Sequence, residues 1–299
     1  MLELISEHAC FGGVQRFYRH PSTAIGLPMR FSVFIPVLPE QARPDQARPG
    51  EAQLPALFYL AGLTCNEETF MAKGGAQRVA AAEGLILIAP DTSPRGADLP
   101  GDDASWDLGV GAGFYVDATE APWSARYRMH SYLLELRELV LRHLPVDAQR
   151  IGVFGHSMGG HGALTLALRH PGLFRSVSAF APIAAPTLSP WGKKAFAAYL
   201  GAERASWEEY DASVLMARAS TPFPAGILID QGLNDQFLSD QLYPEVFEAA
   251  CRAANQPLRL RRHPAYDHGY YFVASFMEDH LRFHATNLTP SRAGLLPPL

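Results

Sequence analysis

The chain has 299 residues, of which 48% are hydrophobic, and its formal net charge is −5, from 25 basic and 30 acidic side chains. This composition supports a sizeable buried core, and the absence of a basic stripe argues against nucleic acid as a partner. Residues 1–13 lack the cationic start of a signal peptide, and no stretch approaches the roughly 18 apolar residues that span a bilayer. Three scattered cysteines favour reduced thiols, so we expect a cytoplasmic protein that does not contact membranes.

Short apolar runs alternate with helix-like segments along the chain. The runs expected to form strands are 29–36, 56–62, 85–91, 151–157 and 226–232. The segments expected to form helices are 131–144, 159–171, 242–255 and 271–288. Buried parallel strands are near-continuous apolar runs, and strands that alternate with helices are typical of α/β folds. The pattern therefore predicts a mostly parallel, doubly wound sheet flanked by helices.

Two segments differ from this pattern. Residues 38–55 are rich in Pro, Gln, Ala and charge and contain a near repeat, which predicts a flexible surface insertion between two strands. Residues 286–299 are expected to form a poorly ordered tail. Because no domain-scale repeat or internal boundary is visible, residues 1–299 are predicted to form a single domain.

The stretch GHSMGGHGAL, residues 155–164, contains Gly-x-Ser-x-Gly directly after an apolar run. A sharp strand-to-helix turn of this kind strains the backbone of its central residue and exposes the hydroxyl of Ser157, with Gly155 and Gly159 leaving room beside it. Gly160 and Gly162 would let the helix pack closely. We interpret Ser157 as a nucleophile, the alternative being a packing turn.

A nucleophilic serine needs a histidine to take its proton and a carboxylate to orient that histidine. On such a sheet the expected chain order is serine, then acid, then histidine. Asp230 and Asp235 both follow the 226–232 run. Asp230 ends the apolar run and is expected to be structural, whereas Asp235 lies in the following loop and is our predicted triad acid.

Two histidines follow in the stretch LRLRRHPAYDHGYYF. His263 alternates with arginines and is expected on the polar face of a strand. His268 lies in the next loop, before the last helix, and is the predicted general base. The neighbouring Asp267 is too close in sequence to reach the far ring nitrogen, so we expect it to stabilise the loop or face solvent.

Four other histidines invite different interpretations. His280 and His284 are four residues apart on a predicted helix and could bind a metal, but no third ligand completes an HExxH pattern, so a surface pair is favoured. His156 and His161 flank Ser157 and are interpreted as packing residues. No metal or organic cofactor is expected.

Acyl transfer also needs donors aimed at a developing oxyanion. The backbone N–H of Met158 follows the nucleophile, and Leu63, in the loop after an early strand, is the second candidate. Cys65 lies two residues further on, either at the edge of a substrate pocket or as a buried spectator thiol.

Two aromatic segments are candidate pocket walls. The glycine-rich stretch that contains Trp106 could line an acyl pocket or form a well-packed loop. Trp191 is followed by Lys193 and Lys194, whose side chains could meet substrate carboxylates or face solvent.

At nearly full length, from about Phe17 to His284, the chain resembles the S-formylglutathione hydrolase (esterase D) family of α/β-hydrolases. The resemblance rests on GLTCNEETF, SWDLGVGAGFYVDAT, PWSARYRMHSY, FGHSMGGHGAL, SAFAPI, PWGKKAF, DQGLNDQFL, YDHGYYF and ASFMEDHLRFH. It implies Ser157, Asp235 and His268 as the triad and suggests Leu63 and Met158 for the oxyanion hole. The chain departs from the family pattern at Gly269 and Ala61, where the family usually has a serine, and in the segment 38–55, which is longer than the usual loop.

The resemblance implies a thioester hydrolase without a cofactor that releases glutathione and formate from S-formylglutathione, in formaldehyde detoxification. A homodimer is a family-level expectation. The nearest rival is a broad carboxylesterase on the same scaffold. A mycolyltransferase-like acyltransferase and a catalytically silent binding protein are further alternatives.

Overall fold

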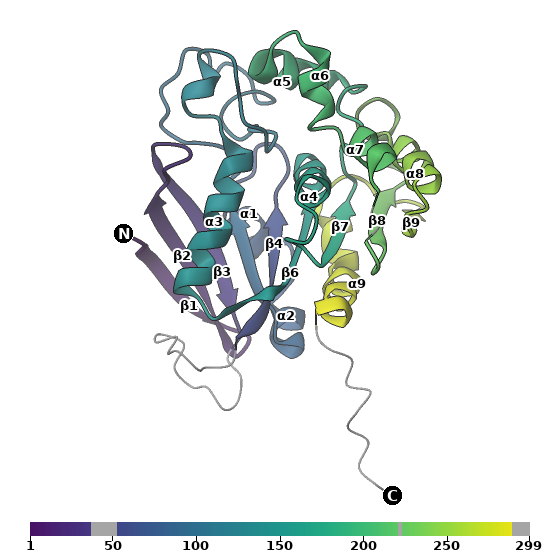
Figure 1. Ribbon diagram of the computed structural model, residues 1–299. Helices are drawn as coiled ribbons and strands as arrows, with labels where there is room; N and C mark the ends of the chain where they lie inside the picture. Colours follow the sequence, from purple (N-terminus) through teal and green to yellow (C-terminus); the bar gives the residue numbers. More distant parts are fainter. Residues whose placement is uncertain (37–52, 221–222, 289–299) are drawn as a thin grey trace, which may run out of the picture.

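The fold is built on one sheet of nine strands (Figure 1) in a computed structural model that describes residues 1–36, 53–220 and 223–288. The strands are β1 (Glu3–Cys10), β2 (Gly13–Pro21), β3 (Pro28–Ile35), β4 (Leu54–Leu60), β5 (Ile86–Pro90), β6 (Val146–His156), β7 (Ser176–Phe180), β8 (Ile227–Gly232) and β9 (Leu258–His263). Their order across the sheet is β1-β2-β3-β5-β4-β6-β7-β8-β9. Strands β1, β2 and β3 each pair antiparallel with the next strand in this order. The remaining six strands, β4 to β9 in chain order, run parallel to one another.

Helices cover both faces of this sheet. They are α1 (Thr69–Lys73), α2 (Gln77–Glu83), α3 (Met129–His143), α4 (Met158–Arg169), α5 (Pro190–Leu200), α6 (Arg204–Glu208), α7 (Ala212–Arg218), α8 (Pro244–Ala253) and α9 (Tyr270–Leu288), with a 3₁₀ turn at Trp123–Ala125 and a π-helical turn at Leu238–Leu242. In Figure 1, α3 and α4 lie in front of the sheet, α2 and α9 lie behind it, and α5 and α6 lie above it. The prediction of a mostly parallel, doubly wound sheet flanked by helices is confirmed.

The central strands are buried from end to end because helices cover both faces. Every residue of β4, β5 and β8 is buried, as are the last six residues of β6. When both faces of a strand are covered, neither set of alternating side chains faces solvent, so these segments are continuous apolar runs. The five strands and four helices expected from the sequence are all present, with ends shifted by a few residues.

Strand β9 is the strand expected to carry His263, and the three other strands were not predicted. Strand β1 forms the edge of the sheet and is exposed along most of its length, so its charged residues hide its strand character. Strand β2, its antiparallel partner, also lacks an uninterrupted apolar run. Strand β7, with the sequence SVSAF, is wholly buried, but its two serines conceal this in the sequence.

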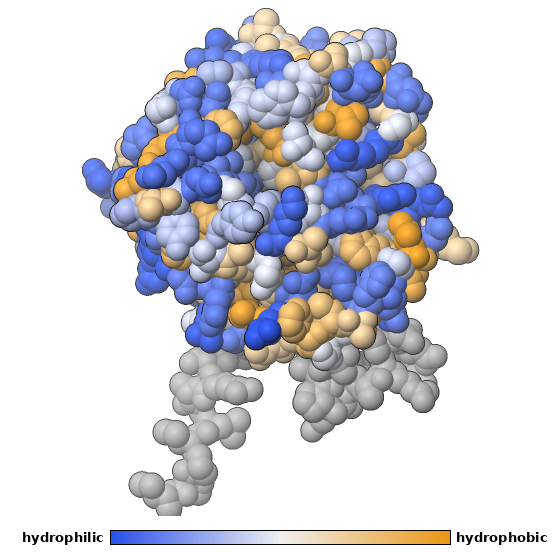
Figure 2. Space-filling model, turned by 180° about the vertical axis from the view of Figure 1, so that it is seen from behind, coloured by the Kyte–Doolittle hydropathy of each residue, from blue (hydrophilic) through white to orange (hydrophobic). Residues whose placement is uncertain are grey.

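The predicted insertion at 38–55 lies outside the described residues except for 53–55, and β4 begins at Leu54. Of the predicted tail, residues 286–288 belong to α9, and 289–299 lie outside the described residues. Seen from behind, the surface is mainly hydrophilic, with hydrophobic residues in separate smaller groups (Figure 2). Within the described part of the chain, no helix is long and apolar enough to cross a membrane.

Candidate active site

Ser157 occupies the turn between β6 and α4. Its backbone has φ +58° and ψ −120°, a region that non-glycine residues rarely adopt. The Ser157 amide donates to the carbonyl of Phe180 at 2.9 Å, and its carbonyl accepts from the amide of Ile183 at 3.2 Å. A strained conformation held by neighbouring segments is the expected geometry of a nucleophile elbow.

The glycines around Ser157 are required by close backbone contacts. A Cβ atom at Gly159 would lie 1.8 Å from the carbonyl oxygen of Leu60, and one at Gly155 would lie 2.3 Å from the carbonyl oxygen of Gly159. At Gly160 a Cβ would lie 2.8 Å from Pro182, and at Gly162 it would meet the Tyr115 ring at 2.5 Å. The turn and the first part of α4 therefore pack against β4 and nearby loops at distances that only glycine permits.

Asp235 and His268 come from two different loops and are hydrogen-bonded to each other. His268 Nδ1 lies 2.5 Å from Asp235 Oδ2. Asp235 follows β8, His268 lies between β9 and α9, and the Asp235 side chain has no exposed surface. Its carboxylate also accepts from Gln231 Nε2 at 3.2 Å and from the backbone amide of Phe237 at 2.8 Å. These bonds fix the carboxylate. The bond to Asp235 uses Nδ1 of His268, so Nε2 of the ring is not involved in it.

Asp230 is part of a different cluster, as expected for a structural residue. Its buried carboxylate accepts from Arg261 at 2.5 and 2.6 Å, and His280 Nε2 and His263 Nε2 each lie 3.3 Å from it. Burial opposes ionisation, but hydrogen bonds from His280 and Arg261 hold the pKa of Asp230 well below its usual value. Asp230 is therefore a buried anion with its partners already in place.

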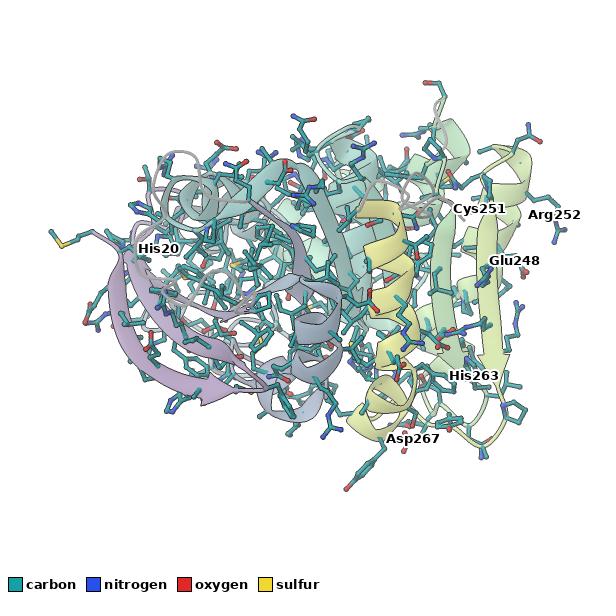
Figure 3. The ribbon with its side chains drawn as sticks, turned by 90° about the horizontal axis from the view of Figure 1, so that it is seen from below. His20, Glu248, Cys251, Arg252, His263 and Asp267 are labelled. Atoms are coloured by element: carbon teal, nitrogen blue, oxygen red, sulfur yellow. The ribbon has the colours of Figure 1, made fainter. Side chains whose placement is uncertain are left out.

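His263 and Asp267 also occupy the roles expected of them. His263 is the last residue of β9 and contacts Asp230, while the exposed Asp267 accepts a hydrogen bond from the amide of Gly269 at 2.8 Å. Figure 3 shows both at the same end of the molecule, beside the start of α9. Asp267 thus stabilises the loop that carries His268.

The loop after β4 lies directly against Ser157. A Cβ at Gly62 would lie 3.2 Å from Ser157 Cβ. The loop is anchored by a bond from the Thr64 amide to Gly111 O, at 2.8 Å, and one from the Tyr115 hydroxyl to Ala61 O, also at 2.8 Å. Among the described residues, the backbone amides of Leu63 and Met158 donate to no protein acceptor. Both remain available for an acceptor from outside the protein.

Aromatic rings connect the candidate pocket residues with His268. The Trp106 and Trp191 rings meet edge to face at 5.6 Å, Trp191 lies 4.6 Å from Phe237, and Phe237 lies 5.0 Å from the His268 ring. Trp106 is 57% exposed, whereas Trp191 is buried. This row of rings runs from the surface to the imidazole. Sequence reasoning missed Phe237, whose only signal is its position two residues after Asp235.

The two lysines after Trp191 have different surroundings. Lys194 forms an ion pair with Asp107 and donates to Ser105 Oγ at 2.8 Å, so it holds the residues on both sides of Trp106. Lys193 is exposed, and its place in a pocket stays a prediction.

Cys65 is half-buried, and its thiol lies near the side chains of Tyr270 and Thr69. Burial raises the pKa of its thiol, which disfavours the reactive thiolate at neutral pH. The hydroxyl of Tyr270 also lies 3.2 Å from that of Tyr59. Its place at the edge of a substrate pocket stays a prediction.

The expectation that His280 and His284 form a surface pair is wrong. Both side chains are completely buried on the face of α9 that covers β7. The two nitrogens of His284 lie 2.6 Å from Ser176 Oγ and 2.8 Å from Ser178 Oγ, and His280 Nδ1 lies 2.8 Å from Ser178 Oγ. The serines of β7 satisfy these histidines, which the sequence of α9 alone could not reveal. Within the described ranges, no three His, Cys, Asp or Glu side chains are grouped to hold a metal ion.

Buried histidines such as His161 should make stability depend on pH. Burial lowers the pKa of His161 to about 4, although a bond to Phe114 O opposes this shift. Between about pH 6.5 and pH 4 the unfolded chain therefore binds a proton at this residue that the folded chain does not, so stability falls as the pH falls. Above about pH 6.5, His161 causes no change of the unfolding free energy with pH. Within this window it lowers the unfolding free energy by up to about 1.4 kcal/mol for each unit by which the pH falls.

We expect His161→Gln, which keeps a side-chain donor without a titrating group, to give a shallower dependence of unfolding free energy on pH. Denaturant titrations between pH 7 and pH 4 measure this. Parallel curves for the variant and the wild type would contradict it.

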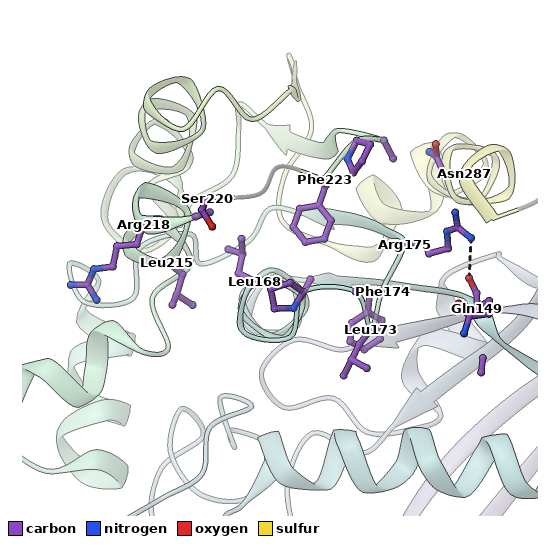
Figure 4. Close-up of a pocket in the computed structure, with 17 residues that line it drawn as sticks. Gln149, Leu168, Leu173, Phe174, Arg175, Leu215, Arg218, Ser220, Phe223 and Asn287 are labelled. Carbon is purple, nitrogen blue, oxygen red and sulfur yellow. Dashed lines mark hydrogen bonds between the residues drawn. The ribbon is translucent and has the colours of Figure 1, made fainter.

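A hollow with a volume of about 880 Å³ lies away from Ser157 (Figure 4). Its walls include parts of β6, α4, α7 and α9 and the segments before β7 and β8, among them Phe174, Arg218 and Phe223. None of its lining residues belongs to the surroundings of Ser157 described above.

The chain is similar to known esterases over nearly its full length. A family model described as “Putative esterase” matches residues 22–283. S-formylglutathione hydrolases of Rattus norvegicus and Mus musculus are 50% and 51% identical over 289 residues, which cover 96% of this chain and 99% of each relative. A solved S-formylglutathione hydrolase from Agrobacterium tumefaciens is 45% identical, with a TM-score of 0.89 over 96% of this chain and 99% of that chain. The predicted α/β-hydrolase fold is thereby confirmed, and the chain belongs to the S-formylglutathione hydrolase family of esterases.

Proposed function

We propose that this chain hydrolyses S-formylglutathione to glutathione and formate, with Ser157 as the nucleophile. The observation that carries the proposal is the strained turn at Ser157, combined with the 2.5 Å bond between Asp235 and His268 on the two loops that follow β8 and β9. The full-length similarity to S-formylglutathione hydrolases supports the choice of substrate.

The triad acts in two half-reactions. Ser157 Oγ attacks the formyl carbonyl carbon while Nε2 of His268 takes the serine proton, and the C–S bond then breaks as that proton passes to the glutathione sulfur. Water attacks the formyl-serine ester with His268 as base, the proton passes from His268 to Ser157 Oγ as the ester C–O bond breaks, and the released formic acid ionises to formate. Asp235 holds Nδ1 of the imidazole and stabilises the imidazolium, a role suited to a buried carboxylate that is already bonded to Gln231 and Phe237.

We assign the oxyanion hole to the backbone amides of Leu63 and Met158. Neither donates to a protein acceptor within the described residues, and the loop of Leu63 lies against Ser157. Donors of this kind are worth about 3 kcal/mol each in the transition state because they need no rearrangement when charge develops.

The row of rings Trp106, Trp191 and Phe237 is the proposed wall for the glutathione part of the substrate. Trp106 is exposed, yet both of its chain neighbours, Ser105 and Asp107, are held by Lys194. A large ring held in place at the surface loses little entropy when a ligand packs on it. Lys193 and Cys65 remain candidates for the edge of the same pocket.

Trp106→Ala should raise KM for S-formylglutathione about tenfold and leave kcat nearly unchanged, since a lost contact of about 1.4 kcal/mol outside the reacting centre weakens substrate binding. KM for p-nitrophenyl acetate, which has no peptide portion, should not change. Phe11→Ala removes another exposed ring, in the turn between β1 and β2, and serves as the control. Equal increases in KM for both substrates would contradict a contact between Trp106 and the glutathione part of the substrate.

The function is tested by kcat/KM for S-formylglutathione and for p-nitrophenyl acetate, measured side by side. A strong preference for the thioester supports the proposal. Comparable or better turnover of the oxyester would favour the alternative, a broad short-chain carboxylesterase on the same triad, and Gly269→Ser and Ala61→Ser would then test whether the departures from the family pattern widen the acyl range.

A cytoplasmic location and a homodimer are the two remaining parts of the proposal. Light scattering of the purified protein measures the second directly. A monomer mass at assay concentration would exclude a dimer as the active form.

A further inference from the structure

His156, the last residue of β6, contacts the proposed catalytic base. Its ring centroid lies 4.6 Å from that of His268, with 44° between the ring planes. Its side chain is buried, with 6% of the residue exposed, and neither ring nitrogen forms a hydrogen bond of ordinary geometry with any described residue. The mechanism above does not use this residue.

A buried histidine without partners costs stability, because two polar atoms lose water and gain nothing in return. Burial and the nearby charge of His268 hold the pKa of His156 well below its usual value, although a weak interaction with the His268 backbone acts the other way. The ring is therefore uncharged at neutral pH. A phenylalanine would fill similar space without this cost, so filling this space requires a ring but not its nitrogens.

The surroundings of His156 connect it with the other parts of the site. A Cβ at Gly62 would lie 3.4 Å from His156 Nδ1, so the ring is in contact with the loop that carries Leu63. Tyr270, the first residue of α9, lies 5.7 Å away, ring to ring. His156 thus fills the space between the oxyanion loop, the start of α9 and the imidazole of His268.

The imidazole of His268 is held at one atom by Asp235, and a single hydrogen bond leaves the tilt of the ring free. Two aromatic contacts restrict that tilt, one with Phe237 at 5.0 Å and 86° and one with His156. His268 must carry a positive charge while the tetrahedral intermediate exists. A charged neighbour at 4.6 Å would oppose that step, whereas an uncharged ring does not.

We propose that His156 is a positioning residue for His268, which by ring packing holds the imidazole in the orientation that reaches Ser157. This rests on the proposed triad. The positioning effect comes from the shape of the His156 ring and not from hydrogen bonds by its nitrogens.

The test compares His156→Phe, which keeps a ring, with His156→Ala, which removes it. His156→Ala should lower kcat by about ten- to a hundredfold with KM within twofold of the wild type, since a small displacement of the base affects the chemical step and not binding. His156→Phe should restore kcat to within about threefold of the wild type and raise the melting temperature, because it removes the two unpartnered nitrogens. His20 is a buried histidine at the opposite side of the molecule with one unpartnered nitrogen (Figure 3), and His20→Phe, the matched control, should change neither kcat nor KM.

Proton NMR gives a readout that a merely structural role would not move. The short bond between His268 and Asp235 should give a far-downfield imidazole N–H signal, present in the wild type, His156→Phe and His20→Phe, and broadened or lost in folded His156→Ala. Wild-type kcat in His156→Ala, or an equal loss in His156→Phe, would overturn the proposal. If the wild type turned over p-nitrophenyl acetate and not S-formylglutathione, the proposed substrate would fail, and the same variants on the ester would still test His156.

Discussion

Ser157→Ala should lower kcat for S-formylglutathione by about a millionfold and leave the fold intact. Removal of the serine of a triad costs about this much because the acyl-enzyme path is lost as a whole, not weakened by one contact. The residual rate should come from substrate binding and from the amides of Leu63 and Met158. Single-turnover assays at high enzyme concentration are needed to measure it.

The control for this variant is covalent labelling by a fluorophosphonate. Wild-type protein should take up one label on Ser157, and Ser157→Ala should take up none while its circular dichroism and melting temperature stay close to those of the wild type. Folded wild-type protein that resists the label would contradict the nucleophile assignment and favour a catalytically silent binding protein.

Much of the fold could be predicted because its central part is governed by burial. Strands β4, β5 and β8 and the second half of β6 are continuous buried runs, and the helices between them repeat leucine or alanine at helical spacing. Strand β7 was missed although it is equally buried. Its Ser176 and Ser178 face His280 and His284 on α9, so each half of this polar layer looks exposed until the two halves are placed together.

The candidate site was predictable to a similar degree. Ser157, Asp235 and His268 could be selected because each follows a strand at the carboxyl edge of the sheet, where loops converge. The contacts of the His268 ring could not be predicted, since Phe237 and His156 meet it only when the end of β6 and the loops after β8 and β9 pack together. Lys194, and not its neighbour Lys193, is tied to the loop of Trp106, and a difference of one residue around a helix cannot be resolved from the sequence.

Asp235 and Asp230 should affect different properties of the protein, the first catalysis and the second stability. Asp235→Asn should lower kcat by about ten-thousandfold with little change in KM, because an amide favours the wrong tautomer of His268 and cannot stabilise its imidazolium. The carboxylate of Asp235 otherwise contacts only one side chain and one backbone amide among the described residues, Gln231 and Phe237. The melting temperature should therefore change little.

Asp230→Asn should have the opposite profile. The substitution leaves the guanidinium of Arg261 without its buried counter-ion and weakens the bonds to His280 and His263, and removing one partner of a buried ion pair costs about 3 kcal/mol or more of unfolding free energy. The Asp235–His268 bond does not involve Asp230, so folded Asp230→Asn should keep kcat within a few-fold of the wild type. Paired measurements of kcat and of denaturant unfolding on both variants decide the matter. A loss of activity in folded Asp230→Asn together with an active Asp235→Asn would transfer the role of triad acid to Asp230, whose ion pair with Arg261 would then have to break during catalysis.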